Sequence, residues 1–275
     1  IESLKITGVL NDVDFLFIYR MMPNLKNLDI AEVNITALPT QAFYNSKNVE
    51  HLILPNTLIT IGEEMFYQSD LRSVVIPTNV TTVGYSAFKR CSSLTTVTFE
   101  KESQLKTIGG DYYYGAFSDC SSLTSIEIPA SVETIEATAF KRCSKLTTVT
   151  FEKGSQLKII GGGFDTNVGY RYIYGAFSEL KNLMTVDMSA CTQVEIIEEC
   201  AFYNDPELRL FKVSTETPPT CENNAFVGIN PYSVLKVPSG CANAYKAATG
   251  WKNFASITGC LLYTSPSPRD RQKSR

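Results

Sequence analysis

The stretch VETIEATAFKRCSKLTTV, Val132–Val149, contains the pattern that decides the fold of this 275-residue chain. It holds a short apolar segment, an Ala-Phe pair, a cysteine three residues later and a second apolar segment. Versions of the pattern recur along the chain, and these phenylalanines mark them: Phe43, Phe66, Phe88, Phe117, Phe140, Phe177, Phe202 and Phe226. Their spacings are 23, 22, 29, 23, 37, 25 and 24 residues. Such a repeat indicates one coil of chain for each phenylalanine.

A coil of about 23 residues is too small to bury its own apolar side chains, so coils of this kind must stack on one another. The apolar residues of each coil are spaced as in strands, for example Leu146, Val149 and Phe151. We therefore predict a solenoid of mainly parallel β coils of about 23 residues, with short helical turns and about eight coils in total.

The repeat resembles a known family. Its pattern, I-P-x-x-V-x-x-I-G-x-x-A-F-x-x-C-x-x-L-x-x-V, resembles the BspA-like leucine-rich repeats of bacterial surface proteins, although Glu136 replaces the usual glycine in the stretch quoted above. The resemblance covers residues 25–235 and implies a leucine-rich-repeat solenoid over this range.

The flanking segments resemble the caps of the same family. Residues 1–24, with a helix expected near 12–22, resemble its N-terminal cap, and residues 236–259 resemble its C-terminal cap. The resemblance implies helical caps at both ends. We expect Trp251 to cover the last coil, because an uncapped solenoid exposes its core and open strand edges.

The last residues, 260–275, do not continue the repeat. Their beginning, CLLYTSPSPRD at Cys260–Asp270, resembles the translation of a sequencing adaptor. We therefore expect a non-native tail, although Ser and Pro are also typical of a native linker. The sequence starts at Ile1, so we expect any signal peptide to lie upstream of it.

Three cysteines share one repeat position, three residues after the phenylalanine: Cys91, Cys120 and Cys143. Small or apolar residues dominate this position in the other coils, so we predict an inward column of buried free thiols. A disulfide between neighbouring thiols is the alternative. The sequence has no C-x-x-C pair and a single histidine, His51, so no metal site and no cofactor are expected.

Two coils carry insertions at the same place, just before the Ala-Phe pair. The insertions add four and twelve residues and read GGDYYYG at 109–115 and GGGFDTNVGYRYIYG at 161–175. Residues 88–110 and 140–162 agree at 20 of 23 positions, which indicates a duplication of two coils. We therefore expect both loops to protrude from one side of the solenoid, about 10 Å apart.

The two loops are rich in tyrosine, which provides a large contact area at low entropic cost, and in glycine, which lets a loop adapt. Loops on a rigid scaffold often carry binding residues. The candidate ligand-binding residues are Asp111, Tyr112, Tyr113, Tyr114, Asp165, Tyr170, Arg171, Tyr172 and Tyr174. The alternative is that these tyrosines fold down onto the apolar edge of their own coils.

Other surface positions offer weaker candidates. The outward strand positions are mostly small and hydroxylated, such as Thr148 and Thr150, as expected of a solvated sheet face. We interpret Lys89-Arg90 and Lys141-Arg142 as surface charges that each contribute little stability.

Composition excludes several classes of function. A net charge of −3 and a pI near 5.4 argue against nucleic acid as a partner. The longest apolar run, Phe15–Tyr19, is too short for a membrane-spanning segment. The family resemblance implies an extracellular or bacterial cell-surface location and adhesion to host extracellular proteins. We therefore expect a non-enzymatic recognition or adhesion module that binds an extracellular protein or glycan.

Two other functions stay open. One is a passive structural spacer for a missing domain. The other is a carbohydrate-active enzyme on a β-solenoid, which needs two carboxylates about 5–9.5 Å apart. Asp111, Asp165 and Glu179 are the acids near the loops that such an enzyme would use, but no local motif supports them.

Overall fold

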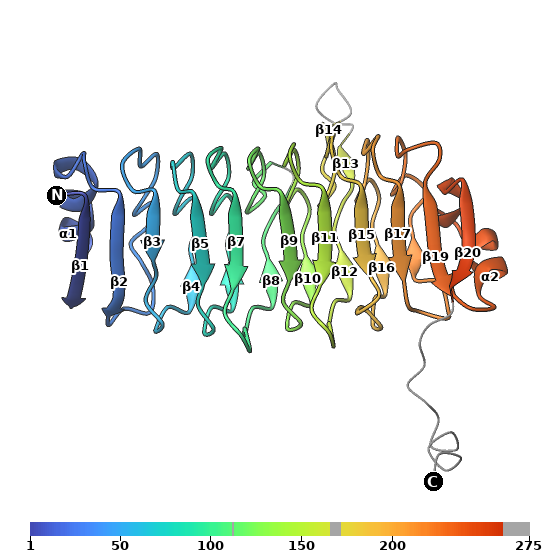
Figure 1. The fold of residues 1–275 in the computed structure, drawn as a ribbon, viewed down its shortest axis with the longest axis horizontal. Helices are drawn as coiled ribbons and strands as arrows, with labels where there is room; N and C mark the ends of the chain where they lie inside the picture. The colour runs from blue at the N-terminus through green and yellow to red at the C-terminus, as the bar shows by residue number, and fades with distance from the viewer. Residues whose placement is uncertain (112, 166–171, 261–275) are drawn as a thin grey trace, which may run out of the picture.

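Stacked coils of chain form a parallel β-solenoid of about ten turns in the computed structural model, which describes residues 1–111, 113–165 and 172–260. The turns follow one another in chain order from the N-terminal end of the rod (Figure 1). The predicted solenoid of parallel β coils is confirmed. The sequence predicted about eight coils, and the additional turns lie at the two ends, where strands pair without a repeat phenylalanine.

One long face of the solenoid consists of parallel strands, one from each turn. A five-stranded sheet comes first: β1 Ser3–Gly8, β2 Asn27–Val33, β3 His51–Ile53, β5 Ser73–Ile76 and β7 Thr96–Phe99. A six-stranded sheet follows: β9 Ser125–Ile128, β11 Thr148–Phe151, β15 Thr185–Met188, β17 Leu210–Val213, β19 Val234–Pro238 and β20 Ser256–Cys260. In β9, Ile126 and Ile128 are buried while Ser125 and Glu127 are exposed. The two-residue period of a strand thus divides core from solvent.

A second sheet is built from seven two-residue strands: β4 Thr60–Ile61, β6 Thr82–Val83, β8 Thr107–Ile108, β10 Thr134–Ile135, β12 Ile159–Ile160, β16 Ile196–Ile197 and β18 Thr220–Cys221. The second residue of each pair is buried. The strands stack in register, so that Ile135 of β10 lies between Ile108 and Ile160. Each turn therefore contributes one side chain to a continuous inner row.

The eight repeat phenylalanines form one column through the core. Each is at most 2% exposed. Successive rings stack with centroids 4.9–5.3 Å apart. This spacing is close to the distance of about 4.8 Å between neighbouring strands, so the backbone period sets the ring spacing. The prediction of buried, stacked phenylalanines is confirmed.

The Ala-Phe segments are hydrogen-bonded turns, and here the prediction of short helical turns is wrong. The residue two positions after each phenylalanine has a left-handed backbone, with φ of 60° at Arg90 and 59° at Arg142. A left-handed residue prevents a right-handed helix from continuing. The N–H of Arg90 instead donates to Ser118 O of the next coil at 2.8 Å, and that of Phe88 donates to Ala116 O at 2.7 Å. The turns thus form a third ladder between coils.

Cys91, Cys120 and Cys143 are buried free thiols, as predicted. Each Sγ donates to the carbonyl oxygen of the repeat phenylalanine one coil earlier, at distances of 2.9, 3.0 and 3.1 Å respectively. The same position holds Asp205 near the C-terminal end. Asp205 is fully buried, and burial raises the pKa of its carboxyl well above the usual range.

A helix lies near each end of the rod (Figure 1). The helix expected near residues 12–22 is α1, Asp12–Met21, and its Phe15 packs edge-on against Phe43 with centroids 6.0 Å apart. Near the C-terminal end lie α2, Ala242–Ala247, and the short helix η1, Trp251–Asn253. None of the helices in the described ranges is long and apolar enough to cross a membrane.

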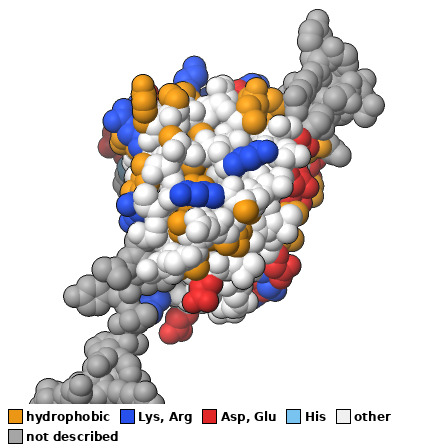
Figure 2. Space-filling model, turned by 90° about the vertical axis from the view of Figure 1, so that its right-hand side faces the viewer, with side chains coloured by type: hydrophobic (Ala, Val, Ile, Leu, Met, Phe, Trp, Pro, Cys, Tyr) orange, Lys and Arg blue, Asp and Glu red, His pale blue; other side chains and the backbone are white. Residues whose placement is uncertain are grey.

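Trp251 is fully buried beside the last repeat phenylalanine, Phe226, with ring centroids 5.5 Å apart. Its Nε1 donates to Pro219 O at 3.0 Å. Figure 2 views this end of the molecule, where hydrophobic side chains are scattered among polar ones. The role of the two helical ends as caps stays a prediction. Strand β20 ends at Cys260, which pairs with Pro238, and the expected non-native tail otherwise lies outside the described residues.

Candidate functional site

Both inserted loops leave the solenoid at the same place on their coils. The N–H of Ala116 donates to Gly109 O at 2.9 Å, and the N–H of Ala176 donates to Gly161 O at 3.0 Å. Each insertion is therefore closed at its base by one backbone hydrogen bond. Phe117 and Phe177 follow the two loops, and the ring of Phe140 lies between theirs, with its centroid 5.2 Å from each. The duplication seen in the sequence thus places the two bases two coils apart.

The first loop is held in shape by its own aspartate. Asp111 Oδ1 accepts hydrogen bonds from the N–H groups of Tyr113, at 2.9 Å, and Tyr114, at 3.0 Å. The carbonyl of Asp111 accepts one from Thr138 Oγ1 at 2.7 Å. This aspartate, nominated as a ligand-binding residue, therefore makes a turn that fixes the two following tyrosines.

A carboxylate from the next coil anchors the start of each loop. Glu136 Oε2 accepts from the N–H of Gly110 at 2.8 Å, and Glu198 Oε2 accepts from the N–H of Gly162 at 2.9 Å. Burial raises the pKa of Glu136, while the N–H of Gly110 opposes this shift. A Cβ at Gly110 would lie 1.9 Å from Ala137 O, so only glycine fits where the coils approach.

Tyr113 and Tyr114 are the candidate residues that reach solvent in the first loop, and they are 40% and 48% exposed. Their ring centroids are 6.2 Å apart at an interplanar angle of 68°. The ammonium of Lys89 lies 5.1 Å from the centroid of the Tyr114 ring and also donates to Tyr113 O. Burial lowers the pKa of Lys89. Tyr112 lies outside the described residues.

The second loop contains a small antiparallel pair, β13 Phe164–Asp165 and β14 Tyr172–Ile173, which Figure 1 shows rising from one edge of the solenoid. Asp165 pairs with Tyr172 through the backbone. Tyr174 packs onto the loop base, because a Cβ at Gly163 would lie 2.3 Å from its ring. Tyr174 therefore agrees with the alternative in which loop tyrosines pack onto their own coil, whereas Tyr113 is exposed. The candidates Tyr170 and Arg171 lie outside the described residues.

Lys141 supports the second loop as Lys89 supports the first, and the duplication makes the two lysines equivalent. Lys141 is almost completely buried, donates to Ile173 O and lies 3.1 Å from Glu179 Oε1. Burial lowers the pKa of Lys141. Burial disfavours the charged form of Glu179, but Arg142 and Lys141 together hold its pKa below the usual value. The interpretation of Lys141 as a surface charge is therefore wrong, whereas Lys89 is partly exposed.

The sequence contained signals for these supporting residues. Both lysines stand one position after a repeat phenylalanine within the duplicated segment. Glu136 and Glu198 occupy a position that is glycine in several coils, and each belongs to the coil that follows an insertion. A polar residue that breaks the repeat beside an insertion thus indicated a contact with the inserted loop.

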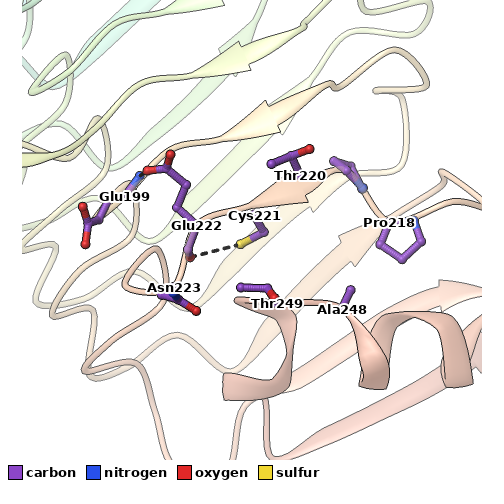
Figure 3. Close-up of a pocket in the computed structure, with 9 residues that line it drawn as sticks. Glu199, Pro218, Thr220, Cys221, Glu222, Asn223, Ala248 and Thr249 are labelled. Atoms are coloured by element: carbon purple, nitrogen blue, oxygen red, sulfur yellow. Dashed lines mark hydrogen bonds between the residues drawn. The ribbon is translucent and has the colours of Figure 1, made fainter.

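A groove of about 540 Å³ lies near the C-terminal end, between β18 and the segment after α2 (Figure 3). Glu199, Glu222 and Thr249 are among its lining residues. The carboxylate of Glu222 accepts from the N–H of Glu199 at 2.7 Å. Burial raises the pKa of the Cys221 thiol to about 12, so this thiol is protonated and a poor nucleophile. In the described parts of the chain, no three His, Cys, Asp or Glu residues cluster to hold a metal ion.

The family assignment agrees with the repeat and the fold. The profile described as the BspA type leucine rich repeat region matches in six copies, over residues 16–115, 113–166 and 170–258. The chain belongs to the BspA-type leucine-rich-repeat family. No curated protein matches the chain.

Similar solved structures come from bacterial leucine-rich-repeat proteins. A leucine-rich repeat protein from Bacteroides ovatus is 19% identical with a TM-score of 0.48, and the match covers 95% of this chain and 73% of that one. A leucine rich cell surface protein from Faecalibacterium prausnitzii is 17% identical with a TM-score of 0.37, over 93% and 70% of the two chains. The pneumococcal vaccine antigen PcpA is 14% identical with a TM-score of 0.37, over 96% and 80%.

Proposed function

We propose that this BspA-type solenoid is a non-enzymatic recognition module that binds an extracellular protein or a glycan through its two inserted loops. The observation that carries the proposal is the exposed pair Tyr113 and Tyr114, held on a loop whose backbone is fixed at several points. Tyrosine and arginine are the residue types most often found at the energetic centres of interfaces.

The support beneath the loops favours binding. A loop that is already ordered loses less conformational entropy when it meets a ligand. Lys89 and Asp111 hold the first loop, and Lys141 holds the second. Spacing by two coils lets one ligand contact both loops. Residues Asp165, Tyr170, Arg171 and Tyr172 are proposed to contribute from the second loop, whereas the packing of Tyr174 gives it a supporting role.

We place this module outside the cell, on the bacterial surface or in the extracellular medium. The family association with bacterial surface proteins supports this location. An adhesive role also fits a rigid rod, since such a rod presents its loops at a constant distance from its ends. Labelling of intact source cells with an antibody against the solenoid tests the location, and a signal seen only after lysis would contradict it.

The binding proposal is tested on arrays of extracellular-matrix proteins and glycans. The double variant Tyr113→Ala/Tyr172→Ala should weaken binding at least tenfold while its melting temperature stays close to that of the wild type. Tyr232→Ala is the matched control, because Tyr232 is 83% exposed and lies outside both loops. Wild-type protein that binds no ligand would support the passive spacer. Unchanged binding by the double variant would move the binding surface to the Thr-rich sheet face.

A further inference from the structure

The outward face of α1 is apolar, which is unusual for a surface helix. Of the fifteen large hydrophobic residues that are exposed in the described ranges, six lie within the first 21 residues. Four belong to α1: Val13, Leu16, Phe17 and Met21. Their spacing of three and four residues places them on one side of the helix. The buried Phe15 and Ile18 occupy the opposite side, so α1 has two apolar faces and only one of them is packed.

The helix itself is well defined at its start. Asn11 Oδ1 accepts from the N–H groups of Val13 and Asp14, at 2.8 and 3.2 Å, and Asp14 Oδ2 accepts from the N–H of Asn11 at 2.9 Å. This reciprocal pair is a capping box. The capping box and the packing of Phe15 fix the helix on the first coils. The outer apolar side chains are therefore presented in a constant arrangement.

One cation lies within this apolar face. Arg20 follows Val13 and Phe17 along the same side of the helix. The other described arginines each contact an acid or a tyrosine: Arg72, Arg90, Arg142 and Arg209. Among the described side chains, which do not include those of Asp12 and Tyr19, the guanidinium of Arg20 has no ion pair and no hydrogen bond. Arg20 is therefore a cation on this apolar face that can pair with an acid of a partner.

Arg20 stands between two grooves at the junction of α1 and the first coil. One groove, of about 530 Å³, is lined by Leu16, Pro39 and Tyr44, and the Tyr44 ring stacks on Tyr67 at 5.1 Å. The other, of about 460 Å³, is lined by Asn45 and by Lys47, which is paired with Asp70. No acid lines either groove among the described side chains, although the whole chain carries a net charge of −3.

We propose that the outer face of α1, together with the groove beside Tyr44, binds a polypeptide segment that carries apolar side chains and a carboxylate. The apolar side chains would cover Val13, Phe17 and Met21, and the carboxylate would pair with Arg20. Exposed apolar patches with polar neighbours mark interaction sites, and arginine is one of the residue types enriched at binding hot spots. This surface is separate from the inserted loops, so a substitution at one site should leave binding at the other site unchanged.

Two other occupants fit the charges less well. A second copy of the chain would bring two Arg20 side chains into one interface, and its own α1 face offers no free acid among the described side chains. Burial of unpaired like charges opposes such a pairing. An anionic membrane is attracted by clusters of basic residues. The two grooves beside α1 are lined by only two cations among the described side chains, Arg20 and the paired Lys47, so this surface lacks such a cluster.

The test uses a library of random dodecapeptides displayed on phage, selected on the full chain. Peptides recovered on the wild type should combine apolar residues with at least one Asp or Glu. Their affinity should fall at least tenfold with Arg20→Glu and also with Phe17→Ser. Phe17 is 58% exposed and Arg20 lies on the surface, so both variants should keep the melting temperature of the wild type.

Matched controls are Arg209→Glu, a surface arginine elsewhere, and Tyr232→Ser, an exposed aromatic residue elsewhere. Both should leave the affinity unchanged. Three results overturn the proposal. The first is recovery of peptides that contain no Asp or Glu, or of peptides that bind the wild type and Arg20→Glu with the same affinity. The second is a dimer in sedimentation that Phe17→Ser dissociates. The third is binding to phosphatidylserine vesicles that Phe17→Ser abolishes.

Discussion

Asp205 makes the stability of this solenoid depend on pH in a way that one substitution removes. Its carboxyl is fully buried, and Oδ1 accepts from the N–H of Leu180 at 2.8 Å while Oδ2 has no partner among the described residues. Burial raises its pKa well above the usual value, and the nearby Glu179 raises it further. Asp205→Asn keeps the acceptor for Leu180 and removes the ionisable group.

The sign follows from the raised pKa. The folded protein holds this proton more tightly than the unfolded chain, in which an aspartate has a pKa of about 3.9. The stabilising contribution is therefore complete below about pH 4 and is lost as the pH rises through the folded-state pKa. Between the two values the contribution of Asp205 falls by about 1.4 kcal/mol for each pH unit. The unfolding free energy of Asp205→Asn minus that of the wild type should therefore increase by about 1.4 kcal/mol for each pH unit from pH 5 upward.

Urea unfolding at pH 5, 5.5 and 6 measures this difference, because contributions from all other groups cancel between the two proteins. A pH-independent part of the difference in unfolding free energy reflects the new amide group, so the test is the change of this difference with pH. Thr96→Ala changes an exposed side chain without an ionisable group, so it serves as control, and its difference from the wild type should not vary with pH. A difference between Asp205→Asn and the wild type that is also independent of pH would show that Asp205 is ionised in the folded core, and the reasoning would fail.

Four further predictions concern the core and the loops. Phe140→Ala should lower the unfolding free energy by about 3–5 kcal/mol in urea titrations, and a loss below about 1 kcal/mol would contradict its place in the ring column. Trp251→Ala should cost a similar amount if the C-terminal end acts as a cap, whereas a negligible change would remove that role. Cys91, Cys120 and Cys143 should resist thiol reagents in the native protein and react after unfolding; labelling of the native protein would contradict their burial. Lys89→Met should speed hydrogen exchange within residues 109–115 while leaving the rest of the coil protected, and unchanged exchange would show that Asp111 alone holds the loop.

The candidate loops were found from the sequence because a strict repeat makes any interruption visible. Insertions at 109–115 and 161–175 stand out against a period of about 23 residues. Their support was not predicted. Lys89 resembles any surface lysine in the sequence, and its contact with the Tyr114 ring exists because the loop reaches back over the preceding coil. Such a contact depends on the path of the loop, which glycine-rich segments leave undetermined.

By itself the sequence determined the solenoid, its phenylalanine column and its buried thiols. These features follow from local rules: a short period cannot bury its own apolar residues, so identical coils must stack, and stacking brings equivalent side chains into contact. The tertiary structure alone decided the left-handed turns, the buried state of Lys141 and the open face of α1. Arg90 and Arg142 adopt left-handed backbones because their N–H groups bond the next coil, and this gain arises only after stacking. Likewise, α1 is apolar on both sides in the sequence, and only its position against Phe43 decides which side is buried.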